Sequence, residues 1–85
     1  MHVTVISPER AVFDGAADAV VAPAFDGQVG ILPGHAPFMT LLGTGVLTVQ
    51  VGGGGGWSKR FEVSGGFLQV VGDAVRVVAD RVEPA

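Results

Sequence analysis

Residues 67–83 read FLQVVGDAVRVVADRVE, and this stretch decides the fold class. Its second part, residues 73–83, is the longest segment of the chain without Gly or Pro, and so it is the best candidate for a helix. The side chains nevertheless alternate at period two, with Arg76 and Asp80 interleaved among Val75, Val77 and Ala79. Gly72 and Asp73 have the composition of a two-residue hairpin loop, because Gly tolerates the positive φ of such a turn. The stretch therefore predicts a β-hairpin over residues 67–79.

Composition extends this prediction to the rest of the chain. Val occurs 16 times and Ile twice, against five Leu and two Met, and branching at Cβ favours strands over helices. The same criteria predict nine strands, at residues 2–6, 11–13, 17–22, 28–31, 38–42, 46–51, 57–63, 67–71 and 74–79. Connections this short leave no room for crossover helices. We therefore expect an all-β fold, a small two-sheet β-sandwich or flattened barrel of about nine to ten short, mostly antiparallel strands.

The length of 85 residues predicts one module, with a single domain over residues 1–85. Apolar residues make up 48% of the chain, and the chain also contains 14 Gly. In typical soluble domains, apolar residues and Gly together form only roughly 45–50% of the chain. A domain this small buries only about 60% of the surface that its unfolded chain exposes. The excess predicts an apolar face that another protein covers.

Charge and residue types exclude several functions. A net charge of −3 disfavours binding to nucleic acid. The chain has no Cys, and His2 and His35 have no neighbouring ligand, so we expect no metal site. The serines lie neither in a nucleophile elbow nor beside a His, and the glycine run at residues 52–56 leads into Trp57 rather than into a phosphate-binding helix. We expect no catalytic residue and no cofactor, and we interpret the glycine run as a hairpin tip.

The segment FDGQVGILPGHAPFMT, residues 25–40, carries the most specific information. Pro33 and Gly34 predict a type II turn, since Pro fixes φ at its second position and Gly accepts positive φ at its third. A rigid loop then displays His35, and Pro37 predicts a sheet margin because it lacks a backbone donor. The residues alone leave a second interpretation open, in which this loop is only a sandwich corner with a capping His.

This segment closely resembles the signature of the epsilon subunit of rotary F-type ATP synthases, called delta in mitochondria. Two further stretches resemble the family in order and spacing, namely residues 5–15 and residues 63–80. The resemblance implies that residues 1–85 form the N-terminal β-sandwich domain of such a subunit. It implies that the two-helix hairpin found after the sandwich in most bacterial members is absent, either because the chain is naturally short or because it is an excised domain.

The resemblance implies a non-catalytic rotor subunit that packs on the gamma shaft and touches the membrane rotor ring of a proton-translocating enzyme. It implies a location on the cytoplasmic face of the bacterial inner membrane, with membrane contact only through the complex. The residues expected to face the shaft are Ser7, His35, Met39 and Thr40, and those expected to face the ring are Asp26, Gly27 and Gln28. The alternative from another class is a free-standing β-sandwich adaptor for a protein or a glycan.

Overall fold

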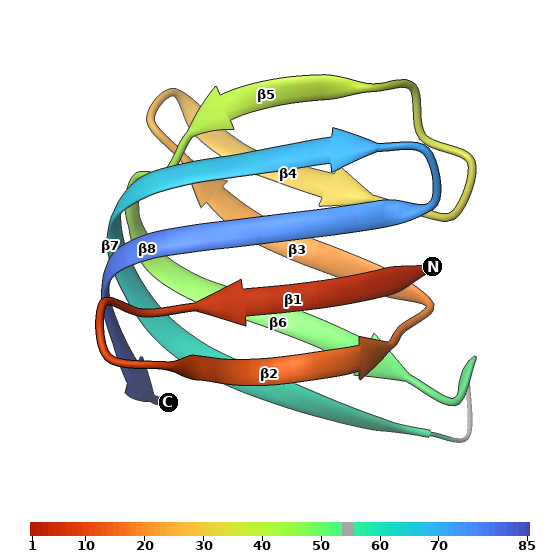
Figure 1. Ribbon diagram of the computed structural model, residues 1–85, viewed down its shortest axis with the longest axis horizontal. Helices are drawn as coiled ribbons and strands as arrows, with labels where there is room; N and C mark the ends of the chain where they lie inside the picture. Colours follow the sequence, from red (N-terminus) through yellow and green to blue (C-terminus); the bar gives the residue numbers. More distant parts are fainter. Residues whose placement is uncertain (54–55) are drawn as a thin grey trace.

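The computed structural model describes residues 1–53 and 56–85, and it confirms the all-β fold class (Figure 1). The strands are β1 (His2–Ile6), β2 (Ala11–Ala16), β3 (Ala19–Ala24), β4 (Gly27–Ile31), β5 (Phe38–Leu41), β6 (Thr44–Val51), β7 (Trp57–Val71) and β8 (Ala74–Pro84). The described residues contain no α-helix, and therefore no helix that is long and apolar enough to cross a membrane.

The strands form one sheet in the order β2-β1-β8-β7-β6-β3-β4, with β5 paired to β7. Only β1 and β8 run parallel among these pairs, so the prediction of mostly antiparallel neighbours is confirmed. The long strands β7 and β8 bend, and the sheet folds into two layers around them (Figure 1). The first layer contains β2, β1, residues 74–79 of β8, residues 66–71 of β7, and β5. The second contains residues 81–84 of β8 and residues 57–64 of β7, with β6, β3 and β4.

The core lies between the two layers and consists mainly of Val, Leu and Ile side chains, with Phe61 and three Ala. Val63, Val75 and Val77, which the alternation places inside, are fully buried or nearly so. The other fully buried large side chains are Val3, Val5, Val20, Ile31, Leu47, Val49 and Leu68. The inward residues of both layers form this core. It contains only part of the apolar residues of the sequence.

The predicted strand count is wrong at one place, because residues 57–63 and 67–71 belong to a single strand, the 15-residue β7. Gly65 and Gly66 interrupt the side-chain pattern and have φ values of 69° and 101°, which other residues rarely adopt. The register with β8 is nevertheless the same on both sides of the two glycines. The glycines therefore bend the strand without ending its pairing, and the described residues contain eight strands rather than nine or ten.

The bend also shifts the alternation of side chains. In β8 the inward residues are Val75, Val77 and Ala79 before the bend and Val82 after it. Ala79 and Val82 are separated by an odd number of positions, whereas regular alternation requires an even number. In β7 a corresponding odd step separates Val63 from Leu68. Because both strands shift at the same register, their inward faces stay matched in each layer.

Two predicted turns can be compared with the structure. Val71 and Ala74 pair across Gly72 and Asp73, and Gly72 has a φ of 59°, so the predicted two-residue hairpin is confirmed. The predicted glycine tip at residues 52–56 includes residues 54 and 55, which lie outside the described residues. The strands on either side of it, β6 and β7, pair antiparallel.

Candidate partner interface

The strand register defines an apolar surface on the outside of the first layer. Side chains that face each other across neighbouring strands point to the same side of a sheet. One row of partners therefore contains Met39, Gln69, Arg76 and Thr4, and the next row contains Leu41, Phe67, Val78 and Ile6. We call the surface formed by these eight residues and Val71 the outer face.

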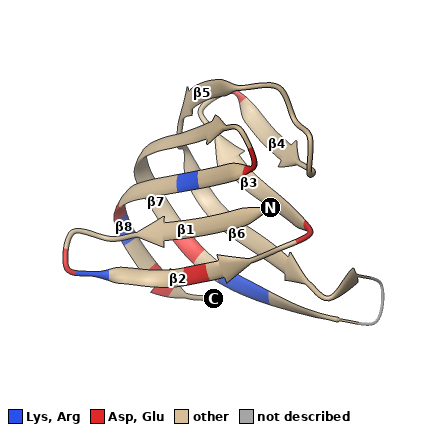
Figure 2. Cartoon of the chain, turned by 45° about the vertical axis from the view of Figure 1, so that its right-hand side comes forward, with Lys and Arg blue, Asp and Glu red and all other residues tan. Residues whose placement is uncertain are grey.

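The outer face is unusually apolar for a surface open to solvent. Met39 is 64% exposed, Leu41 61% and Val71 56%, while the charged side chains of this layer lie mainly at its margins. The ribbons of β1 and β5 carry no Lys, Arg, Asp or Glu (Figure 2). An antiparallel sheet with one solvated face normally places polar side chains on that face. An exposed apolar face of this kind is typical of a surface that another protein covers.

Most of the outer face was not predicted from the sequence, although the sequence holds a signal for it. Strands of the first layer contain pairs of adjacent large apolar residues, and in a strand two adjacent side chains point to opposite faces. One member of each pair enters the core and the other lies outside. These pairs are Val5 with Ile6, Leu41 with Leu42, Val70 with Val71, and Val77 with Val78.

Met39 and Thr40, both predicted to face the shaft, point to opposite sides of β5. Met39 lies beside Gln69 on the outer face, whereas Thr40 pairs with the buried Leu68. Thr40 stays half-buried because β5 is an edge strand, and its hydroxyl donates to the backbone carbonyl of Leu41 at 3.5 Å. The structure thus places only Met39 of this pair on the outer face.

His35 lies in the loop that leads into β5. The backbone N–H of His35 donates to the carbonyl of Leu32 at 3.1 Å, and Gly34 has a φ of 85°, so the predicted type II turn is confirmed. The imidazole Nδ1 donates to the carbonyl of Ala36 at 2.7 Å, and the ring packs against Phe38 with centroids 4.8 Å apart. These contacts hold the half-buried His35 in a fixed position at the start of the edge strand.

Gly34→Ala should lower the free energy of unfolding by about 1–2 kcal/mol, because a Cβ is disfavoured at positive φ. Open space surrounds the position, so backbone strain rather than a clash sets the size of the effect. Urea denaturation followed by circular dichroism measures it. Gly30→Ala is the matched control, since Gly30 has no positive φ and no atom within 4 Å of an added Cβ. Equal stabilities for the two variants would contradict the turn assignment.

Ser7 is buried in the turn between β1 and β2. Its hydroxyl donates to the carbonyl of Arg10 at 3.1 Å and accepts from the Arg10 N–H at 3.3 Å. This turn lies at the left end of the sandwich in Figure 1, whereas the loop of His35 lies at the right end. The structure therefore does not bring Ser7 close to His35.

The predicted ring-facing residues lie where β3 connects to β4, with Asp26 in the turn and Gly27 and Gln28 as the first two residues of β4. Asp26, Gly27 and Gln28 are all exposed, and Gly27 has a φ of 137°. The preceding Phe25 is 72% exposed, and its backbone N–H donates to the carbonyl of Leu41 at 3.3 Å. This bond places the turn at the C-terminal end of β5, so the three residues lie together at the margin of the outer face.

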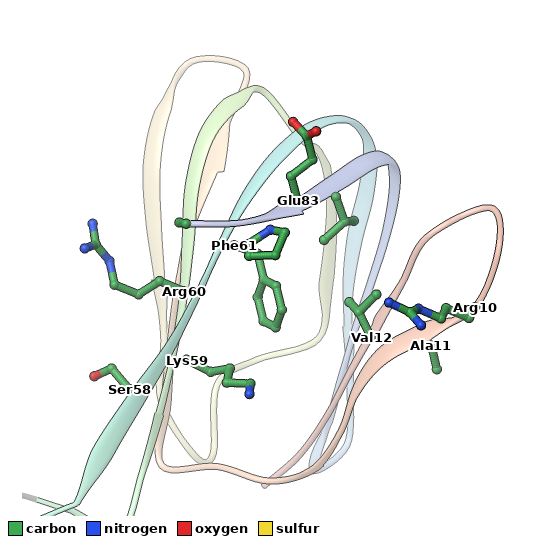
Figure 3. A pocket seen from close by; sticks show the side chains of 11 residues that line it. Arg10, Ala11, Val12, Ser58, Lys59, Arg60, Phe61 and Glu83 are labelled. Carbon is green, nitrogen blue, oxygen red and sulfur yellow. The ribbon is translucent and has the colours of Figure 1, made fainter.

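A groove of about 610 Å³ lies elsewhere, between the start of β2 and the far ends of β7 and β8 (Figure 3). Phe61 and Val12 contribute apolar side chains, and Lys59, Arg10 and Glu83 contribute charges. Ser58 is the only hydroxyl in its lining, and no His accompanies it, so the lining holds no Ser–His pair of the kind that activates a serine nucleophile. Among the residues that the structure describes, no three His, Asp or Glu side chains gather as a metal site requires.

Comparisons with known proteins agree with this fold. The family model of the "ATP synthase, Delta/Epsilon chain, beta-sandwich domain" matches residues 1–85. The ATP synthase epsilon chain of Solibacter usitatus is 45% identical over 85 residues, which is all of this chain and 61% of that protein. The epsilon chain of Desulforamulus reducens is 47% identical over 83 residues, 95% of this chain and 59% of that protein.

The chain thus spans about three fifths of the length of these curated relatives. Among solved structures, a chain of the Euglena gracilis mitochondrial ATP synthase superposes with a TM-score of 0.86 at 24% identity, covering 96% of this chain and 51% of that one. This similarity supports the fold, and the sequence matches support the family. The chain belongs to the family of ATP synthase delta/epsilon chain β-sandwich domains.

Proposed function

We propose that this chain is a non-catalytic rotor subunit of a proton-translocating F-type ATP synthase, and that residues 1–85 are its N-terminal β-sandwich domain. The outer face packs on the gamma shaft, and the turn of Asp26, Gly27 and Gln28 contacts the membrane rotor ring. The chain thereby helps to couple ion flow to ATP synthesis. It is held at the cytoplasmic face of a bacterial inner membrane through the complex.

The observation that carries this proposal is the apolar outer face on a domain of this family. Met39 and Leu41, both more than half exposed, lie in adjacent rows of it, and Phe67 and Val78 continue the second row across the layer. A rotor subunit must stay attached to its shaft during rotation, and permanent interfaces are more apolar than transient ones. His35, in the loop before β5, and Thr40, on the edge strand β5, border the outer face and extend the proposed contact, whereas the buried Ser7 presents no exposed side chain to it.

Size-exclusion chromatography tests the proposal. The chain is mixed with an F1 complex of the alpha, beta and gamma subunits from which epsilon has been removed. We expect the chain to elute with the complex in a 1:1 ratio to gamma at micromolar concentration. Elution of all the chain as a free 8.6 kDa species would contradict the proposed function.

The double variant Asp26→Lys/Gln28→Lys tests the ring contact separately. Both side chains are exposed, Asp26 in the turn and Gln28 at the start of β4, so we expect the free energy of unfolding to stay within about 0.5 kcal/mol of the parent. The affinity of the variant for gamma should change by no more than about twofold. The affinity of the gamma–epsilon pair for the isolated ring should fall about tenfold, because like charges or lost contacts at the rim of an interface cost about 1–2 kcal/mol. Unchanged ring affinity would contradict the assignment of this turn.

A further inference from the structure

Arg76 occupies the centre of the outer face. It lies on β8, the middle strand of the five-stranded first layer, with β7 and β5 on one side and β1 and β2 on the other. Its partners in the row are Gln69 and Thr4, both uncharged. The row on one side contains Phe67, Val78 and Ile6. The row on the other side contains Val71 and Ala74. Among the described residues, Arg76 is therefore the only Lys or Arg in these rows. Toward the β2 edge, the rows also hold His2, opposite Ala74, and Asp14, opposite Thr4.

Two carboxylates lie in or beside this row, and both contact other groups. Asp14 lies two strands away, opposite Thr4, and its Oδ1 lies 2.5 Å from Nε2 of His2. Asp73, at the hairpin, lies 3.8 Å from the N-terminal ammonium group. Among the described residues these are the only close contacts between a carboxylate and a basic group, and neither includes Arg76. Arg76 is exposed, and among the described residues no acidic side chain pairs with it, so its guanidinium faces solvent.

A partner that covers the outer face must remove this solvent. Because Arg76 is at least two strands from either edge of the layer, at a spacing of about 4.8 Å per strand, a bound partner would enclose its guanidinium within the contact. An unpaired charge buried in a contact is strongly unfavourable, and a guanidinium is best compensated by a carboxylate that accepts two parallel hydrogen bonds.

We infer that the surface of the gamma shaft that covers the outer face carries an Asp or Glu that pairs with Arg76, surrounded by apolar residues. This inference rests on the proposed function and specifies the chemistry of its partner. The ion pair fixes the register in which the two apolar surfaces meet, because sliding by one row would bring the carboxylate against Val78 or Ala74 instead. Arg76 is thus the specificity-determining residue of the interface.

The test measures the affinity of purified gamma-containing F1 for the parent chain and for Arg76→Met, Arg76→Lys and Arg76→Glu. Arg76→Met keeps most of the side-chain volume without the charge, and we expect affinity to fall about 30-fold or more. The affinity of Arg76→Lys should lie between those of the parent and of Arg76→Met, because Lys keeps the charge and loses the bidentate geometry. Arg76→Glu should bind weakest, and reversal of one acidic residue of gamma to Arg should restore its affinity.

Arg81→Met is the matched control, because Arg81 is exposed on the same strand beyond the bend, opposite Ser64 in the second layer. We expect its affinity to stay within about twofold of the parent, as for an isolated surface charge. If the parent binds gamma and Arg76→Met binds equally well or more tightly, the inference is wrong while the proposed function stands. If the parent itself does not bind, the proposed function fails and this inference fails with it.

Discussion

Gly66→Val should destabilise the sandwich by more than about 3 kcal/mol, a large part of the stability of so small a domain. A Cβ at position 66 would overlap the carbonyl oxygen of Val78 and approach Cα of Ala79 to 2.9 Å. The backbone φ of 101° adds strain of about 1–3 kcal/mol for any residue other than Gly. Both layers meet at this bend, and no flexible side chain can move aside, because the obstructing atoms belong to the backbone of β8.

Urea denaturation followed by circular dichroism measures this effect. Gly30→Val is the control, because Gly30 lies in β4 with no positive φ and with open space around it. Its stability should stay within about 1 kcal/mol of the parent, since Val is well accommodated in strands. A Gly66→Val variant as stable as the control would show that β7 does not bend at its two glycines.

The double variant Met39→Asp/Leu41→Asp should bind the gamma shaft at least about a hundredfold more weakly than the parent chain. Both side chains are largely exposed, so the change hardly affects the core. On docking, however, two carboxylates would be buried among apolar side chains, and burying unpaired charge in a contact costs several kcal/mol. Isothermal titration calorimetry with gamma-containing F1 measures the loss.

Gln50→Asp is the control for this variant, because Gln50 is exposed on β6 in the second layer, away from the outer face. Its affinity should match that of the parent within about twofold. The unfolding free energy of each variant is measured in parallel, so that a loss of binding is not confused with a loss of fold. Parent-like affinity for the double variant would exclude the outer face as the shaft contact.

The fold was largely predictable because local signals agree along much of the chain. The hairpin around Gly72 and Asp73 and the type II turn at Pro33 and Gly34 depend on residues within four positions of one another. The merging of two predicted strands into β7 was not predictable in this way. Gly65 and Gly66 normally indicate a turn, and only the unbroken pairing with β8, a tertiary feature, keeps the strand continuous.

The candidate site was predictable only in part. Family resemblance pointed to Met39, which does lie on the outer face, but it grouped with it Thr40 and Ser7, which the structure places elsewhere. The position of Arg76 at the centre of the face depends on the pairing of β8 with β1 and β7. The pairing with β7 is the local hairpin that the sequence predicts, but the pairing with β1 joins segments about seventy residues apart, and no local pattern specifies it.

Cysteine accessibility tests the central claim most directly, because the chain contains no Cys and each single-Cys variant is therefore specific. Met39→Cys and Gln50→Cys are labelled with a maleimide, first as free chains and then in the assembled F1 complex. We predict that assembly slows labelling at position 39 at least tenfold, on the order of the protection that a buried interface gives, and leaves position 50 unchanged. Labelling at position 39 that is as fast in the complex as in the free chain would contradict the claim that the outer face packs on the shaft.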